Sequence, residues 1–172
     1  MAFFRIKNIK GKEYVYIVES NWKDNSSRQK VKSYIGRVYR FTIKNDVDFL
    51  QFMKIKNIEA YINKNHRNKI MNDLIEWEIF KFGIDKDEFP LDLDNCKILK
   101  NNRNGAILVN DGYMCNLTLK NLLEFKPEGD EETDGYRFAR AFVEAGIKIP
   151  QDVFVRLFEK LYKTKEEIKD NG

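Results

Sequence analysis

The chain opens with an alternation of tyrosine and aliphatic side chains that only an extended strand can use. Within residues 13–20, Tyr14 and Tyr16 alternate with Val15 and Ile17. Successive side chains of a strand point to opposite faces, so this order predicts a sheet with one tyrosine-rich face and one aliphatic face. The neighbouring segments of the N-terminus are therefore expected to supply strands that pair with this one.

Two neighbouring segments share the same strand character. Gly11 lies between the first two segments and supplies the positive φ that a tight hairpin turn requires. Residues 21–29 are polar and predict a mobile loop, and Gly36 predicts a bulge or bend in the third segment. The sequence therefore predicts an antiparallel meander. Its three strands are expected over residues 3–9, 13–20 and 30–41.

After residue 42 the apolar spacing changes to the three-to-four-residue period of amphipathic helices. A second hairpin is expected between residues 96–100 and 106–110, because Asn104-Gly105 favours a tight turn. Helices are expected over residues 47–53, 58–62, 67–82, 116–125, 136–145 and 150–162.

The predicted fold class is therefore α+β, with an N-terminal three-stranded antiparallel β meander followed by a mainly helical body that contains a second short β-hairpin. The expected divisions are a basic meander module at residues 1–42, a helical α+β body at 43–165 and a flexible tail at 166–172. The two cysteines, Cys96 and Cys115, lie among apolar neighbours, so both are expected to be small buried hydrophobic residues.

Several classes of protein receive no support from the composition. No apolar run approaches the roughly 20 residues that a membrane span needs, and the charged start of the chain does not suit a secretory signal. The expected location is therefore the cytoplasm, with no membrane partner. The single histidine, His66, has no zinc-ligand neighbours in the sequence, and no glycine-rich phosphate loop occurs. The sequence predicts no metal, no cofactor and no enzymatic activity.

The acidic loop at residues 129–135 is the one segment whose residues could suggest a metal site. Carboxylates bind Mg²⁺, so this loop leaves a metal-dependent nuclease as a remote alternative function. Acidic residues that precede a helix are explained more simply by their favourable interaction with the helix dipole.

Positive charge is concentrated at the N-terminus. The formal net charge of the chain is +4, but residues 1–40 alone carry ten Lys and Arg against three Asp and Glu. Residues 121–172 carry nine against twelve. Lys and Arg gain affinity for phosphates by releasing condensed counterions, so this polarity predicts a nucleic-acid-binding surface on the meander.

Aromatic side chains are interleaved with this charge, and such side chains can stack on unpaired bases. An equally simple alternative is a solvated sheet, because Tyr and Val favour strands and edge lysines protect against aggregation. The candidate nucleic-acid-binding residues are Lys10, Lys12, Tyr14, Tyr16, Trp22, Lys23, Arg28, Lys30, Lys32 and Arg37.

Residues 10–38, KGKEYVYIVESNWKDNSSRQKVKSYIGRV, carry a resemblance to a known family. The segment resembles the amino-terminal segment of prokaryotic insertion-sequence transposases of the DDE class. The resemblance implies a β module associated with DNA-handling proteins, and it does not extend to a transposase catalytic core. A second segment, residues 129–150, is similar to small archaeal proteins of unassigned function. The matching positions of the first segment are Gly11, Lys12, Tyr14, Tyr16, Val18, Glu19, Ser20, Arg28, Gln29, Tyr34 and Gly36.

Two functions are consistent with these observations. The first is a non-enzymatic accessory protein that binds nucleic acid, expected to be DNA, through the basic tyrosine-rich sheet. The alternative is a protein–protein interaction or oligomerisation module with no nucleic-acid role, in which the two C-terminal helices pair with another copy or another protein. Its support is a set of aromatic residues at helical spacing, namely Phe138, Phe142, Phe154, Phe158 and Tyr162.

Overall fold

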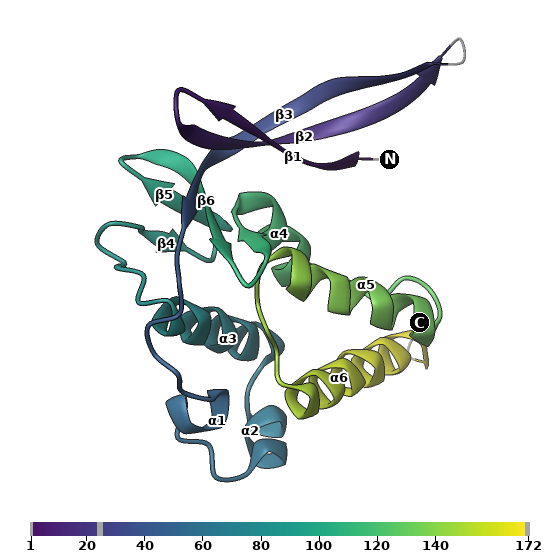
Figure 1. Ribbon diagram of the computed structural model, residues 1–172. Coiled ribbons are helices and arrows are strands. Elements are labelled where there is room, and N and C mark those ends of the chain that lie inside the picture. Colours follow the sequence, from purple (N-terminus) through teal and green to yellow (C-terminus); the bar gives the residue numbers. More distant parts are fainter. Residues whose placement is uncertain (1, 24–25, 171–172) are drawn as a thin grey trace.

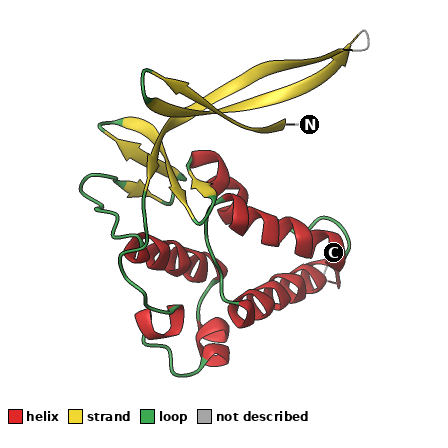
Figure 2. Cartoon of the chain, viewed as in Figure 1, coloured by secondary structure: helices red, strands yellow, loops and turns green. Residues whose placement is uncertain are grey.

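The structure is a computed structural model that describes the backbone of residues 2–23 and 26–170 and the side chains of residues 3–20 and 29–163. It contains both helices and strands, which confirms the α+β class (Figure 1). Figure 2 shows the strands gathered at the top of the view and the helices below and beside them.

The N-terminal meander is present. Strands β1 (Ala2–Ile9), β2 (Lys12–Lys23) and β3 (Ser26–Arg40) pair antiparallel in chain order, and Gly11 has the positive φ, 75°, expected of the first turn. The predicted loop at residues 21–29 is wrong, because β2 and β3 continue to pair there as far as Lys23 opposite Ser26. Polar sequence does not end a ladder whose backbone groups satisfy one another.

Beyond β1 the paired strands form a two-stranded arm. The last residue of β1 to pair is Ala2, opposite Glu19, whereas β2 and β3 run on past this point. Figure 1 shows β2 and β3 projecting away from the helices.

The sheet continues into the body through a pairing that the sequence analysis did not predict. β3 lies parallel to β6 (Arg103–Val109), from Arg37 opposite Gly105 to Arg40 opposite Leu108. β6 also pairs antiparallel with β5 (Lys97–Lys100) and with β7 (Gly112–Met114), and β4 (Leu91–Asp92) pairs with β5. The meander and the body therefore share one sheet, with the order β1-β2-β3-β6-β5-β4.

The pairing of β5 with β6 differs from the expected second hairpin. It comprises Leu99 opposite Asn104 and Lys100 opposite Arg103. The connecting residues are Asn101 and Asn102, whose φ angles are 52° and 58°. Asparagine tolerates this left-handed region, so the turn forms earlier than the Asn-Gly pair on which the prediction relied.

Six helices make up most of the body. α3 ends at Lys81, and Gly83 follows its C-cap with a φ of 56°, the positive φ predicted for the residue after this helix. α5 starts five residues before the predicted position, because the Asp130 side chain accepts a hydrogen bond from the Thr133 amide and caps the helix there. The helices are α1 (Phe49–Phe52), α2 (Ile58–Lys64), α3 (Arg67–Lys81), α4 (Asn116–Leu123), α5 (Glu131–Glu144) and α6 (Gln151–Asp170).

The expected C-terminal tail overlaps the end of α6. Residues 166–170 are helical, and residues 171–172 lie outside the described part of the chain. Both cysteines are buried and unpaired, as predicted, and Cys115 occupies the N-cap position of α4. No helix in the described residues is long and apolar enough to cross a membrane.

The main hydrophobic core surrounds α3 and extends between α5 and α6. Phe138 and Phe142 are fully buried there, and Phe158 is only 9% exposed. The rings of Phe138, Phe154 and Phe158 stack on one another across the two helices, with the Phe154 and Phe158 planes only 2° apart. These aromatic side chains are therefore used within the chain's own core.

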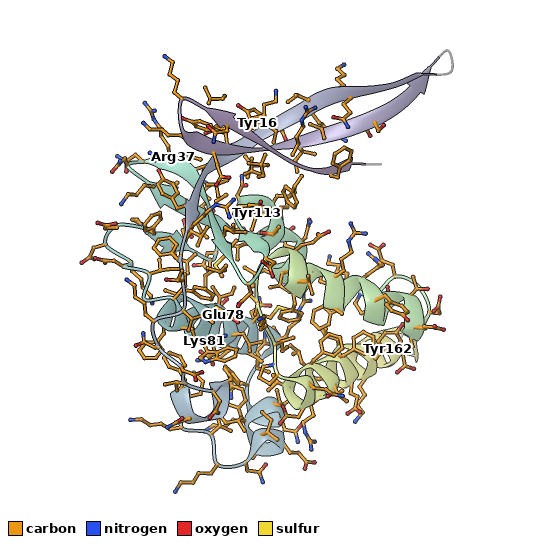
Figure 3. The ribbon with its side chains drawn as sticks, viewed as in Figure 1. Tyr16, Arg37, Glu78, Lys81, Tyr113 and Tyr162 are labelled. Carbon is orange, nitrogen blue, oxygen red and sulfur yellow. The ribbon has the colours of Figure 1, made fainter. Side chains whose placement is uncertain are left out.

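A buried ion pair lies at the centre of the body (Figure 3). The Glu78 carboxylate, which is fully buried, accepts hydrogen bonds from Lys81 Nζ, from the Asn110 side chain and from the Lys148 amide. Lys81 Nζ also lies 4.1 Å from the centroid of the Trp77 ring. The pair connects α3 to the β6–β7 turn and to the segment between α5 and α6.

A second, smaller hydrophobic cluster fixes the meander to the body. It joins side chains of β2 and β3 to Ala106 of β6 and to Cys115 at the start of α4. Phe4 packs from β1 against Tyr113, with ring centroids 5.8 Å apart. Figure 3 places Tyr113 below the meander, on the side of α4. The cluster's other buried members are Val15, Ile17, Ile35 and Val38.

Candidate nucleic-acid interface

The strand register sorts the side chains of the meander onto two faces. Directly opposite residues of paired strands share a face, and neighbours along a strand alternate. Tyr16 lies opposite Arg5 on one side and Tyr34 on the other, whereas Val15 and Ile17 belong to the hydrophobic cluster beneath the sheet. We call the Tyr16 side the outer face and the Val15 side the inner face. The predicted separation into tyrosine-rich and aliphatic faces is thus present in β2.

The two faces differ in charge. On the outer face the described side chains of β1, β2 and β3 include four cations, three tyrosines and no carboxylate, whereas Glu13 and Glu19 both lie on the inner face. The outer face comprises Phe3, Arg5, Lys7, Ile9, Lys12, Tyr14, Tyr16, Val18, Ser20, Gln29, Val31, Tyr34 and Arg37. The inner face comprises Phe4, Ile6, Asn8, Glu13, Val15, Ile17, Glu19, Lys30, Lys32, Ser33, Ile35, Val38 and Arg40.

Three tyrosine rings form a cluster on the outer face. The Tyr34 ring centroid lies 5.3 Å from that of Tyr16 and 6.3 Å from that of Tyr14, with the planes tilted. Tyr34 is 54% exposed, whereas its two neighbours are half-buried. Lys7 Nζ lies 4.9 Å from the centroid of the Tyr16 ring. The cluster therefore presents one accessible ring, supported by two others and accompanied by a cation.

Arg37 stands beside this cluster (Figure 3). Its guanidinium carbon lies 4.9 Å from the centroid of the Tyr39 ring, which packs edge-on against Phe89. The Arg37 Nε atom is buried and has no hydrogen-bond partner among the described residues. The side chain is thus held in place by aromatic packing rather than by an opposing carboxylate.

Two β-bulges in β3 produce this arrangement. Ile35 is skipped between the pairs Val15–Gly36 and Tyr16–Tyr34, which brings Arg37 onto the same face as Tyr34 although they are three residues apart. An extra residue in a strand reverses the alternation beyond it. The predicted bend at Gly36 therefore lies next to a bulge.

The second bulge, at Lys32, removes two candidate residues from the site. Simple alternation would place Lys30, Lys32 and Tyr34 on one face, but the register places Lys30 opposite Glu19 on the inner face. Lys32 lines a groove of about 630 Å³ with Ile35 of the same strand, also on the inner side. The register therefore separates Lys30 from the tyrosines, whereas Lys32 lines the same groove as Tyr34.

That inner groove lies between β3 and the body. Its walls include Leu117 at the start of α4, and lysines of three different elements line it. Lys120 also lies 4.0 Å from Glu124 in the next turn of α4. The three lysines are Lys32, Lys97 and Lys120.

The remaining candidates fall into two groups. Lys10 and Lys12 flank Gly11 in the exposed β1–β2 turn, and Lys12 lies on the outer face. The side chains of three further candidates lie outside the described residues, although their backbone is paired in the arm. These are Trp22, Lys23 and Arg28.

Three cations of the outer face were not among the candidate residues. Arg5 and Lys7 alternate with buried Ile6 in β1, a signal that period-two analysis of the first strand would have found. Arg103 joins the same face through the parallel β3–β6 pairing, which has no local sequence signal.

Burial raises the pKa of Tyr34, and so do Tyr16 and Tyr14, whereas the charge of Arg103 acts to lower it.

The outer-face cations are available for an anionic ligand. Among the described residues, neither Lys7, Lys12 nor Arg37 forms an ion pair, and Arg5 donates a hydrogen bond of 2.6 Å to the neutral Gln29 side chain. By contrast, Arg40 on the inner face donates two hydrogen bonds to Glu13, and this hydrogen bonding lowers the pKa of the Glu13 carboxyl.

The acidic loop before α5 has a structural role. Asp130 caps the helix, and the buried Asp134 carboxylate accepts hydrogen bonds from the Gly129 amide, Arg137 and Tyr162. Within the described side chains, no group of three or more His, Cys, Asp or Glu residues is arranged to hold a metal ion.

Comparisons with known proteins give no function for this chain. No protein-family model, curated protein or solved structure matches the chain. The resemblance to transposase amino-terminal segments stays a prediction.

Proposed function

We propose that this protein binds nucleic acid through the outer face of its N-terminal meander. The observation that carries the proposal is the sorting of charge by the strand register. It leaves Arg5, Lys7, Lys12 and Arg37 on a face to which β1, β2 and β3 contribute no described carboxylate, although Lys12 and Arg37 also line a pocket with Glu13 and Glu88. Clustered cations with no internal counter-charge attract a polyanion and release its condensed counterions. The resemblance of residues 10–38 to transposase segments favours DNA as the natural ligand.

The aromatic and apolar side chains of the outer face give further support. A face that only kept the sheet soluble would carry charged and polar groups, as edge and surface strands commonly do. Here four large hydrophobic side chains are exposed among the cations, namely Phe3 (39%), Ile9 (45%), Val31 (44%) and Tyr34 (54%). Cations combined with aromatic platforms are typical of surfaces that hold a nucleic-acid strand.

Three of the five aromatic residues that suggested the oligomerisation alternative are used inside the chain. Phe138, Phe142 and Phe158 are buried between α5 and α6, so these side chains stabilise the chain's own core. Pairing of the C-terminal helices with another copy stays a prediction, and the large hydrophobic side chains that these helices expose are Tyr136, Val143 and Val155.

The experiment compares two double variants that remove equal charge from opposite faces. Fluorescence anisotropy would measure binding of a labelled mixed-sequence oligonucleotide at low salt. Lys7→Gln with Arg37→Gln should weaken binding about tenfold or more, at about 1 kcal/mol for each lost contact. Lys30→Gln with Lys32→Gln lowers the net charge by the same amount on the inner face and should leave binding nearly unchanged.

Two results would contradict the proposal. One is the absence of binding by the wild-type protein to any oligonucleotide at low salt. The other is equal weakening by the outer-face and inner-face variants, which would indicate only a non-specific effect of net charge.

A further inference from the structure

We infer that the outer face selects single-stranded nucleic acid, whose unpaired bases stack on Tyr34 and the side chains around it. The inference rests on the proposed function and specifies the ligand of the same site. It follows from how the rings, the apolar side chains and the three strands are arranged on that face.

Tyr34 is the accessible platform. More than half of the residue is exposed, and its ring contacts the rings of Tyr16 and Tyr14. These contacts already restrict the side chain, so the binding of a base costs little additional conformational entropy. Its hydroxyl is protonated and uncharged at neutral pH, as for any tyrosine, and burial raises its pKa further. A supported neutral ring suits stacking, because every base has a π-face and the interaction is tolerant of sequence.

The exposed apolar neighbours favour a ligand with accessible base faces. In a duplex the bases stack on one another, so its exterior offers phosphates, sugars and the edges of bases in the grooves. Val31, Phe3 and Ile9 would gain little from such a surface. An unpaired strand can turn its bases toward these side chains and keep its phosphates near the surrounding cations.

The width of the sheet points the same way. The major groove of DNA is about 12 Å wide and admits an α-helix or a two-stranded ribbon. Three strands at a spacing of about 4.8 Å span about 10 Å between backbone axes before side chains are added. β1 pairs along β2 as far as Glu19, so the part of the face that carries Tyr34 is three strands wide. That region is too broad to enter a groove.

The cations border the platform instead of covering it. Lys7 lies over Tyr16 and Arg37 is stacked on Tyr39, so both charges flank the exposed Tyr34 ring. Arg103 approaches from β6 and acts on Tyr34 electrostatically. A strand whose bases contact the centre of the face would pass its phosphates along this border.

The test measures the affinity of the full chain for a single-stranded oligonucleotide of about 16 nucleotides, the upper end of the usual site size. The same sequence is also offered as a duplex, and the single strand is supplied as both DNA and RNA. We expect tighter binding of the single strands, and Tyr34→Ala should lower their affinity roughly fivefold or more.

Two further variants make the test specific. Tyr34→Leu keeps an apolar side chain but removes the flat ring, so it should lose affinity as Tyr34→Ala does while preserving the packing against Tyr16. Tyr136→Ala is the matched control, because Tyr136 is 72% exposed on α5 and belongs to the body. Its affinity should equal that of the wild type.

The possible failures can be told apart. Equal binding of duplex and single strand, with no loss in the Tyr34 variants, would overturn the single-strand inference and leave nucleic-acid binding in place. Preference for the duplex would also overturn it. Binding to none of the oligonucleotides would remove both the inference and the proposed function.

Discussion

A single added methyl group at the junction of meander and body gives a sharp test of how the sheet is assembled. Gly36 of β3 faces the backbone of β6, and a Cβ atom built on it would lie 2.5 Å from the Asn104 carbonyl oxygen. Ordinary contacts between carbon atoms begin at about 3.5 Å. Gly105 lies in β6 nearby, and a Cβ atom there would meet only ordinary contacts, the nearest at 3.6 Å to the Tyr39 ring.

Two opposing effects set the magnitude. Replacing glycine by alanine stabilises a protein by about 0.4–1 kcal/mol through the unfolded chain, where the native conformation accepts a side chain. Overpacking against a backbone atom costs about 1–3 kcal/mol. Gly36→Ala should therefore lose about 1–2 kcal/mol, which corresponds to a decrease in Tm of about 2–8 °C for a chain of this size. Gly105→Ala should be neutral or slightly stabilising.

Urea titration and thermal melts followed by circular dichroism would compare the two variants with the wild type. Neither glycine has a positive φ, so backbone strain does not complicate the comparison. If Gly36→Ala proved as stable as Gly105→Ala, β3 would not pack on β6 as described, and the outer face would lose its fixed relation to the body.

Three further predictions address the core, the acid response and the interface. Glu78→Gln leaves the Lys81 ammonium buried without its carboxylate and should destabilise the fold by about 3–5 kcal/mol in urea titration, so a loss below 1 kcal/mol would count against the buried pair. Burial alone would raise the pKa of Asp134, but hydrogen bonds from Glu128 and Gly129 amides, Tyr162 and Arg137 hold it below its ordinary value. The stabilisation by Asp134 is complete above the ordinary pKa of an aspartate and is lost as the pH falls through the pKa of the folded state. In Asp134→Asn the urea concentration at the unfolding midpoint should therefore fall less steeply as the pH is lowered. A pH dependence equal to that of the wild type would refute this role of Asp134. The logarithm of affinity for a single strand should fall with the logarithm of salt with a slope of magnitude about 3 or more, at about 0.7 for each of the four outer-face cations of β1, β2 and β3, and a slope near zero would contradict the role of these cations.

Much of the fold was predictable because its signals are local. The alternation around Tyr16 places two faces on β2, and the apolar spacing of residues 67–82 locates α3 together with the glycine that ends it. The pairing of β3 with β6 was not predictable, since it joins residues as far apart in the sequence as Arg37 and Gly105, and parallel strands are not connected by a tight turn that the sequence could reveal. β4 and β7 were missed for a related reason: strands of two and three residues are too short to show a period.

The candidate site was predicted only in part, and the two bulges of β3 explain why. Period-two analysis groups Lys30 with Tyr34 and separates Arg37 from Tyr34, which is the reverse of the observed register. A bulge depends on how two strands fit together, so neither Ile35 nor Lys32 carries a sequence mark of its own. Tyr14 and Tyr16 were placed correctly because β2 has no extra residue.

Ultraviolet cross-linking to a single-stranded oligonucleotide, followed by mass spectrometry of the attached peptides, tests the central claim most directly. Nucleic acid bound to the outer face should attach to peptides that contain Tyr34, Tyr16 or Tyr14, whose rings lie together there. Attachment confined to Tyr113 beneath the sheet or to Tyr136 on α5, with none on the outer-face tyrosines, would contradict the account.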